Sequence, residues 1–508
     1  MTELRAGAAA LPLAPPLDLP MVGFIRQPST ATGYGWPLET TALVLEGGGT
    51  RVVLCGVDIV GIGEPEVSRL VDRVAEATGA EPAGVLLNWN HTHLAPVGGS
   101  WGGEIVGEPE AERDRRVRAF ADVIQDKVVS VCRLAAERLE PAGVVWGVGQ
   151  ADLAVNRRER AGGTTILGWN PDNLVDNQVT AFQVRRPDES PICTLVSYGC
   201  HPVTTGYDMS IYSADYPGPL RSVVRGVTGG ECVFFQGAGG NVLPRVAFTD
   251  SEAEAEAMGR RLGVEALHAL ADRFSVPQRM IWRQEGSVTP ISAYRRQREP
   301  SEPPALAAAR ERVRFPLLAH PSVEEVAAVR AEWEPRLEDA RRSGDVGRTK
   351  VAWYHVGWAR RTEAALREGT APTFTEGPIH AVRIGEGVIA TGPGETFSEM
   401  GMAVKERGPG SPTLYCGYTN GLVSYFATAA EYPYGGYEAD YGCRSVGLPS
   451  HVAPECEQIL VETAVRLAER LFPEAPPWDG GRGWTATGAL PRLPPPEPLL
   501  HPGSRGTA

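Results

Sequence analysis

The stretch TTALVLEGGGTRVVLCGVDIVGI, residues 40–62, contains two apolar runs separated by three glycines. β-branched residues cluster on both sides of the glycines, a pattern that predicts two strands joined by a turn. The following EPEVSRLVDRVAEATG, residues 64–79, has apolar side chains at helical spacing and ends in a glycine, which predicts a helix. AGVLLNWN, residues 83–90, predicts the next strand. This alternation favours an α/β fold.

The alternation continues along the chain, with a long helical pattern at 115–141 and strand-like runs at 142–155 and 192–200. Residues 301–372 differ because they are charged, Ala-rich and helical in pattern throughout. We therefore expect an α/β fold of mixed sheets flanked by helices, with an inserted helical subdomain. The expected organisation is one catalytic domain over 1–472, a helical insertion within it at 301–372, and a Pro/Gly-rich C-terminal tail at 473–508.

The composition bears on partners and location. The 508 residues include 49 Lys and Arg against 62 Asp and Glu, and no basic stripe stands out, so we expect no nucleic-acid partner. No apolar window reaches the length of a membrane helix, the N-terminus has no signal-peptide pattern, and the eight cysteines form no C-x-x-C pair. We expect a cytoplasmic protein with a small-molecule substrate and no membrane partner; a homo-oligomer is left open.

Three of the nine histidines follow predicted strands. His91 and His93 come after the strand at 83–90, and His201 comes after the strand at 192–200. Ligands of α/β proteins collect at strand ends, and imidazole is a common zinc ligand, so the three histidines suit a metal site. They are equally explained as hydrogen-bonded polar groups that end two strands.

Two later segments also carry candidate groups. Glu395 follows an apolar run and a Pro-Gly turn, where it could be a ligand or could complement a helix dipole by roughly 0.3–1 kcal/mol. Five tyrosines lie between residues 425 and 441, in a Gly-rich segment that suits either a site or an aromatic surface loop.

Six motifs occur in a fixed order: NHTHLAPVGG, NRRER, CHPVTT, FFQGAGGNVLPR, TGPGETFSEMG and AAEYPYGGYEADYG. Together they resemble the N-terminal catalytic domain of the neutral/alkaline (non-lysosomal) ceramidase family, over roughly residues 5 to 472. The resemblance implies a ceramidase-like catalytic domain that hydrolyses an amide bond. The chain would be a divergent member, since the C-terminal domain of the family is not found in it.

The resemblance implies one zinc ion per chain, and it assigns roles residue by residue. The implied metal ligands are His91, His201, Glu395 and Tyr432. The implied catalytic residues are His93, Arg157 and Tyr441, and the implied substrate-binding residues are Arg157, Asn241 and Leu243. Leu243 and Asn241 stand where the family has a serine and an aspartate, and the segment 437–441 is shorter than in the family. Arg157 could also be a surface arginine in the charged NRRER turn.

The chemistry follows from zinc with mixed nitrogen and oxygen ligands and one open position, which lowers the pKa of bound water to near 7. The resulting hydroxide would attack a carbonyl carbon, and protonated His93 and Tyr441 would stabilise the oxyanion, each by roughly 3 kcal/mol. We expect a zinc-dependent amidohydrolase that cleaves a C–N bond of a soluble small molecule rather than of a membrane sphingolipid. One alternative is a zinc enzyme of the same superfamily for lactam or ester opening or the reverse ring closure. The other is a non-catalytic zinc-containing binding protein.

Overall fold

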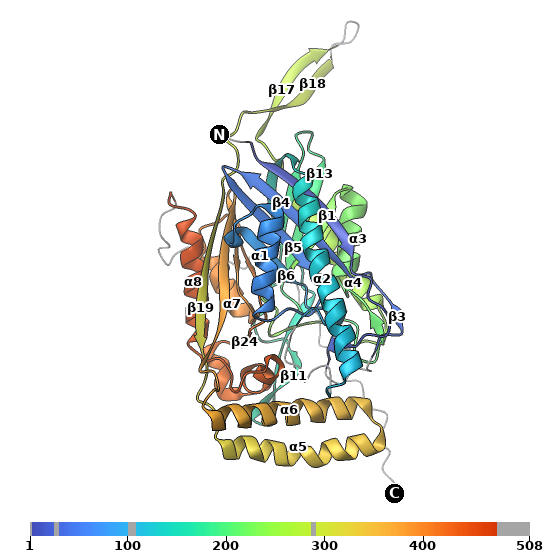
Figure 1. The fold of residues 1–508 in the computed structure, drawn as a ribbon. Helices are drawn as coiled ribbons and strands as arrows, with labels where there is room; N and C mark the ends of the chain where they lie inside the picture. Colours follow the sequence, from blue (N-terminus) through green and yellow to red (C-terminus); the bar gives the residue numbers. More distant parts are fainter. Residues whose placement is uncertain (1–2, 25–29, 100–107, 286–290, 475–508) are drawn as a thin grey trace.

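Three sheets meet around one apolar centre in the computed structural model, which describes residues 3–24, 30–99, 108–285 and 291–474 (Figure 1). The first sheet has the order β6 (Val85–Trp89), β5 (Thr50–Val57), β4 (Glu39–Gly47), β1 (Arg5–Pro12) and β8 (Glu140–Pro141). The second has the order β15 (Glu231–Gln236), β13 (Pro191–Tyr198), β12 (Gln178–Arg185) and β9 (Gly143–Gln150). The third has the order β19 (Leu306–Pro316), β20 (Phe374–Ile384), β21 (Gly387–Thr391) and β23 (Thr413–Cys416).

The first sheet forms as its sequence predicts. β4 and β5 pair in antiparallel register around Gly48 and Gly49, which both have positive φ. Alternate side chains then point to opposite faces: Leu43 joins the central core that the three sheets share, while Val44 joins a second core on the outer face. Helices α1 (Glu66–Thr78) and α2 (Ala111–Glu137) cover that outer face.

The other two sheets repeat this arrangement. Helix α4 (Ala253–Leu270), packed on α3 (Pro217–Thr228), covers the outer face of the second sheet. Helices α7 (Ser398–Arg407) and α8 (Cys456–Arg470) cover the outer face of the third. Each sheet combines antiparallel pairs with one parallel pair, which is β5–β6, β13–β15 or β21–β23. The expected α/β class with mixed sheets and flanking helices is confirmed.

Shorter elements complete the described fold. The remaining strands are β2 (Met21–Gly23), β3 (Gly33–Tyr34), β7 (Leu94–Pro96), β10 (Ala154–Ala161), β11 (Thr164–Asn170), β14 (Ile211–Tyr212), β16 (Val242–Pro244), β17 (Gln278–Glu285), β18 (Ile291–Arg298), β22 (Glu395–Thr396) and β24 (Tyr425–Phe426). The short 3-10 helices are η1 (Pro82–Gly84), η2 (Ala429–Tyr434), η3 (Tyr437–Ala439) and η4 (Gly442–Val446). β17 and β18 form a hairpin that extends away from the body (Figure 1).

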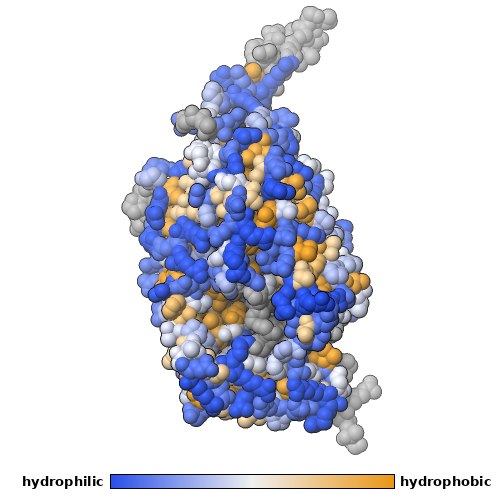
Figure 2. Space-filling view, in the orientation of Figure 1, coloured by the Kyte–Doolittle hydropathy of each residue, from blue (hydrophilic) through white to orange (hydrophobic). Residues whose placement is uncertain are grey.

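The segment 301–372 is only partly helical. Helices α5 (Val323–Ser343) and α6 (Val346–Glu368) lie antiparallel at one end of the molecule, and mainly hydrophilic side chains cover them on the side in view in Figure 2. Residues 306–316, however, form the strand β19, so their expected helical structure is wrong. The strand wins because it pairs along its whole length with β20, and this tertiary pairing overrides local helix propensity. Helices α5 and α6 therefore form an insertion between the paired strands β19 and β20.

The expected C-terminal tail, 473–508, lies outside the described residues beyond residue 474. Among the described residues, no helix is both long enough and apolar enough to cross a membrane.

The buried carboxamide of Asn88, in β6, joins the three sheets where their parallel strands end. Its Nδ2 donates to the Gly417 carbonyl at 2.9 Å, just beyond β23 of the third sheet. Its Oδ1 accepts the backbone N–H of Gln236, the last residue of β15 in the second sheet, at 2.7 Å. Asn88 therefore fixes the relative position of three strand ends.

We expect Asn88→Leu to destabilise the protein by roughly 2 kcal/mol, since it leaves the buried N–H of Gln236 without its acceptor. It also removes one of the donors to the Gly417 carbonyl, which the Thr419 hydroxyl still contacts at 2.8 Å. Urea unfolding of the purified variant measures this loss. Asn173→Leu is the control, because the Asn173 side chain bonds only its neighbour Leu174 at the surface. Equal unfolding free energies for the two variants would contradict the proposed junction.

Candidate functional site

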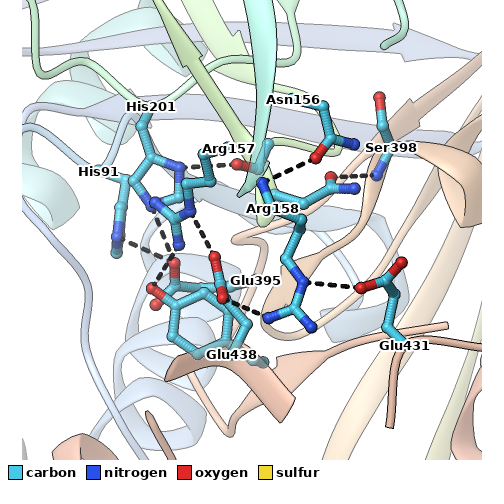
Figure 3. Close-up of polar contacts among 12 residues, drawn as sticks. His91, Asn156, Arg157, Arg158, His201, Glu395, Ser398, Glu431 and Glu438 are labelled. Atoms are coloured by element: carbon cyan, nitrogen blue, oxygen red, sulfur yellow. Dashed lines mark hydrogen bonds and ion pairs between the residues drawn. The ribbon is translucent and has the colours of Figure 1, made fainter. Parts of the chain in front are cut away.

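Each of the three sheets contributes one residue to a single polar cluster. His91 follows the end of β6 in the first sheet, His201 follows the end of β13 in the second, and Glu395 follows the end of β21 in the third. The three side chains point toward one another (Figure 3). The structure thus brings together three of the four residues expected to bind metal.

The donor atoms of this cluster suit a cation. His91 Nε2 lies 3.3 Å from Glu395 Oε2, and His201 Nε2 lies 3.1 Å from the same oxygen. The Nδ1 atoms of the two rings lie 2.7 Å from the Val60 carbonyl and 2.6 Å from the Gly239 carbonyl. These carbonyls need Nδ1–H donors, so each Nε2 presents a lone pair. Two lone pairs and a carboxylate oxygen that face one another suit a shared proton or a metal ion.

Gln236 fixes the backbone immediately before His91 and His201. Its Nε2 donates to the carbonyl of Cys200 at 2.7 Å and to that of Asn90 at 3.1 Å. These two residues immediately precede His201 and His91. One buried amide therefore sets the spacing of two imidazoles that are 110 positions apart in the chain.

His93 lies in the cluster, but not because it shares a strand face with His91. β6 ends at Trp89, and His91 has a φ of +68°, so the alternation of a regular strand does not apply to His91 and His93. The ring of His93 nevertheless lies 5.0 Å from that of His91 and 5.7 Å from that of His201. The ligand atoms of the three histidines all lie within 4.8 Å of one another, so the three imidazoles could also hold a metal ion by themselves.

The surroundings set the charge of these groups. Burial and the nearby Arg157 lower the pKa of His201 to about 4, and burial with the two other imidazoles lowers the pKa of His93 well below its usual value. Burial opposes ionisation of Glu395, but His91 and His201 outweigh it and hold the pKa of this carboxyl well below its usual value. Neutral imidazoles and an ionised carboxylate are the forms that bind metals. The protonated His93 expected from the sequence is disfavoured here.

Arg157 belongs to the cluster and not to the surface, since it is only 4% exposed. It lies where the pairing of β10 with β11 is interrupted between Asn156 and Arg158, and such an irregularity redirects a side chain. Its guanidinium donates to Glu438 at 2.6 Å and lies 3.2 Å from His201 Nε2. Burial opposes the charge of this guanidinium, but Glu438 outweighs it and raises the pKa of Arg157.

A buried network of charges continues outward from Arg157. Glu438 binds Arg157 with one carboxylate oxygen and Arg158 with the other (Figure 3). Glu431 binds both Arg158 and Arg160. Both glutamates lie in the short 3-10 helices η2 and η3. The network therefore attaches this irregular segment to β10, beside the histidines.

The tyrosines differ from the expected assignment. Tyr432 donates its hydroxyl to the Val452 carbonyl at 2.7 Å, and Tyr441 is 40% exposed and packs on Tyr437. Neither hydroxyl is brought to the histidine cluster. Tyr425 pairs with Glu395 in the β22–β24 ladder, and its hydroxyl accepts from Arg157 at 3.3 Å. Tyr425, rather than Tyr432, is therefore the tyrosine of this segment that lies beside Glu395 and Arg157.

Tyr437 likewise lies closer to the cluster than Tyr441 does. Its ring lies 5.4 Å from that of Tyr425, so it is one ring from the cluster, whereas Tyr441 lies a further ring away. The sequence places five tyrosines in residues 425–441. The backbone turns of η2 and η3 determine which of their side chains lie close to the histidines.

The two expected substrate-binding residues on the Gly-rich segment have separate environments. The amide of Asn241 is used internally: it donates to Glu399 at 2.8 Å and accepts the Ser398 N–H at 2.8 Å, at the start of α7. Leu243 lies in a small apolar cluster with Val155 and Val203. The first residue positions a helix, and the second contributes to an apolar wall.

Three residues of the site are absent from the sequence-based assignment. They are Tyr418, Tyr425 and Glu438. Tyr418 lies 4.7 Å from the His91 ring and directs its hydroxyl to Glu395 at 3.5 Å. It follows β23, so the rule that found the histidines, a polar residue after a strand, could have found it. No comparable signal marks Glu438, whose two arginine partners lie about 280 residues earlier.

Glu438→Gln keeps the shape of this side chain and removes its charge from two buried arginines. We expect it to destabilise the protein by about 3–5 kcal/mol, the usual effect of breaking a buried ion pair. Glu311→Gln is the matched control: it breaks a two-bond pair with Arg466 at the surface and should cost less than about 1 kcal/mol. Urea unfolding of both variants checks this, and similar losses would exclude a structural role for the buried network.

Comparisons with known proteins concern the fold. The chain superposes on a neutral ceramidase from Pseudomonas aeruginosa with a TM-score of 0.64 and 18% sequence identity, over 92% of this chain and 75% of that one. A ceramidase complexed with C2 gives a TM-score of 0.64 and 16% identity, over 93% and 76% of the two chains. No family model matches the chain, and no curated protein sequence matches it. At these identities the likeness establishes the fold alone: the chain has a ceramidase-like fold, as its ordered motifs predict.

Proposed function

We propose that the protein is a zinc-dependent hydrolase that cleaves an amide-type C–N bond of a soluble small molecule. The observation that carries the proposal is the convergence of His91, His201 and Glu395 on one point, with each histidine Nδ1 held by a backbone carbonyl. The ceramidase-like fold supports it, because ceramidases with this fold are known. The metal, the reaction and the substrate are all part of the proposal.

His91, His201 and Glu395 would hold the metal, and Tyr425 is proposed as a fourth ligand in place of Tyr432. A zinc ion, when bound, would supply Lewis acidity that polarises an amide carbonyl and makes a water molecule more acidic. Burial and Arg157 lower the pKa of His201, so this ring is neutral, and the pKa of Glu395 is held well below its usual value, so this carboxyl is ionised; these are the states that metal ligands require.

The residues around the ligands would manage protons and charge. Neutral His93 can accept a proton from the attacking water at a ring nitrogen and deliver it to the leaving nitrogen as the C–N bond breaks. The products would be a carboxylate and an amine. Arg157, held by Glu438 beside His201 and Tyr425, can stabilise the negative charge that develops on the carbonyl oxygen. This assigns Arg157 to catalysis as well as to substrate binding.

The ligand assignment predicts which side chains control metal content. His91→Ala and His201→Ala should each lose most of the bound zinc, whereas His380→Ala should keep it, because His380 is buried elsewhere against Ala83 and Asn420. Elemental analysis of the purified variants measures this. Full zinc in a His91→Ala, His201→Ala double variant would refute the site.

Two tyrosine variants distinguish Tyr432, the ligand expected from the sequence, from Tyr425, the ligand proposed from the structure. Tyr425→Phe should weaken zinc binding in a competition assay with a chelator. Tyr432→Phe should leave zinc binding unchanged and lower only stability, because its hydroxyl bonds the Val452 carbonyl. The reverse result would restore Tyr432 as the ligand.

His93→Ala should keep the zinc and lower kcat by about 10²–10³-fold, as expected for loss of a proton-transfer or oxyanion group. The assay is a screen of N-acyl amino acids, lactams and ceramides with the zinc-loaded protein, followed by kinetics on the best substrate. Zinc content, melting temperature and rate are measured on one sample. Loss of zinc would make His93 a third histidine ligand, and wild-type turnover would make it a structural residue.

A further inference from the structure

A cluster of three aromatic side chains contacts His93 through Phe24. The ring of Phe24 lies 4.7 Å from the His93 ring, edge to face, and Tyr207 and Phe248 lie 6.1 and 5.9 Å from Phe24. Tyr207 is 37% exposed and Phe248 is 44% exposed. We call Phe24, Tyr207 and Phe248 the aromatic rim. It leads from the surface to a residue of the proposed catalytic group.

The backbone places Phe24 against His93. β2 pairs with β7 so that Gly23 lies opposite Leu94, the residue after His93. A Cβ on Gly23 would lie 2.5 Å from His93 Cγ, and Gly23 has a φ of +124°. Only glycine therefore fits at position 23, and the residue that follows the strand, Phe24, packs against the imidazole.

Phe248 is held in an unusual conformation. Its φ is +58°, a value that bulky side chains rarely adopt. Its N–H donates to the Val203 carbonyl at 2.9 Å, and Gly206 packs so closely that an added Cβ would lie 2.7 Å from the Phe248 carbonyl carbon. An exposed and strained phenylalanine gains little for the fold by burial. Such strain clusters at ligand sites.

An apolar wall continues the rim inward. Val155, Val203 and Leu243 form a buried cluster, and Phe24 and Trp169 pack against it. Phe24 thus joins this wall and the other two rings to His93, whereas Arg157 and Glu395 lie with His201 on the metal-binding side of the cluster. A substrate carbonyl near His93 would therefore have an apolar neighbour on one side and charged neighbours on the other.

We propose that the aromatic rim binds an aryl acyl group of the substrate, so that the preferred substrates are N-aroyl or similar planar N-acyl compounds. The inference rests on the proposed amide hydrolysis. The rings of Tyr207 and Phe248 each meet Phe24 at about 70°, as in edge-to-face packing, and a further planar ring can extend this arrangement. A rigid ring also loses less conformational entropy on binding than a long alkyl chain.

The test compares three amides that differ only in the acyl group: N-benzoylglycine, N-acetylglycine and N-octanoylglycine. The zinc-loaded full chain should show the lowest KM for the benzoyl compound. Phe248→Gly should raise this KM by about tenfold and leave the KM for N-acetylglycine and kcat nearly unchanged. Tyr207→Leu should have the same effect, and Phe374→Ala, which removes an exposed ring packed on Arg314, should have none.

Stability provides a second measurement. Because glycine adopts positive φ readily, Phe248→Gly should keep or raise the melting temperature if Phe248 serves a ligand. A lower melting temperature with unchanged benzoyl selectivity would assign Phe248 to the fold and overturn the inference.

Benzoate binding tests the aromatic rim independently of whether the protein hydrolyses amides. If no amide is cleaved, calorimetric titration with benzoate and with acetate still tests the rim. Binding of benzoate that is lost in Phe248→Gly would support the rim while the hydrolase proposal fails. Equal affinity for benzoate and acetate, or no benzoate binding at all, would overturn the rim, and so would hydrolysis without preference for the benzoyl compound.

Discussion

The buried hydrogen bonds of Asn88 are the constraint on which the site depends. Three sheets pack on one apolar centre, and apolar packing is not directional, so it leaves their relative sliding weakly determined. Asn88 removes this freedom because its amide bonds the ends of strands in the other two sheets. Gln236 then bonds the residues before His91 and His201. The candidate metal ligands are thus placed by amide hydrogen bonds between strand ends.

A second constraint holds the irregular segment that completes the site. The segment from Tyr425 to Val446 has few regular backbone pairs, and the buried glutamates Glu431 and Glu438 attach it to the arginines of β10. Breaking a buried ion pair is costly, so the position of this segment is well determined even without a sheet. The same pairs orient Arg157 toward His201. One set of charges thus serves both the architecture and the proposed chemistry.

The site also contains unusual backbone conformations. His91, Tyr418 and Phe248 all have positive φ, although none is a glycine. Such residues persist only where the surroundings over-determine them. His91 and Tyr418 are held by the strand junction and contact each other, while Phe248 is held by Val203 and Gly206 at the rim. Three of the seven residues other than glycine that have positive φ in the described part of the chain therefore lie where metal and substrate are proposed to meet.

The amino-acid sequence by itself determined the α/β alternation, the β4–β5 hairpin and helices α1 and α2, because these follow from local periodicity. The position of the histidines after strands indicated a possible site, and the resemblance of the ordered motifs to a known family added His91, His201 and Glu395 as candidate ligands. The strand β19, and the fact that Tyr425 rather than Tyr432 lies beside Glu395, were decided only by tertiary structure. β19 exists because β20 supplies its hydrogen bonds, and Tyr425 reaches the cluster because β24 pairs beside Glu395. Both outcomes depend on partners distant in the chain, which a local pattern does not encode.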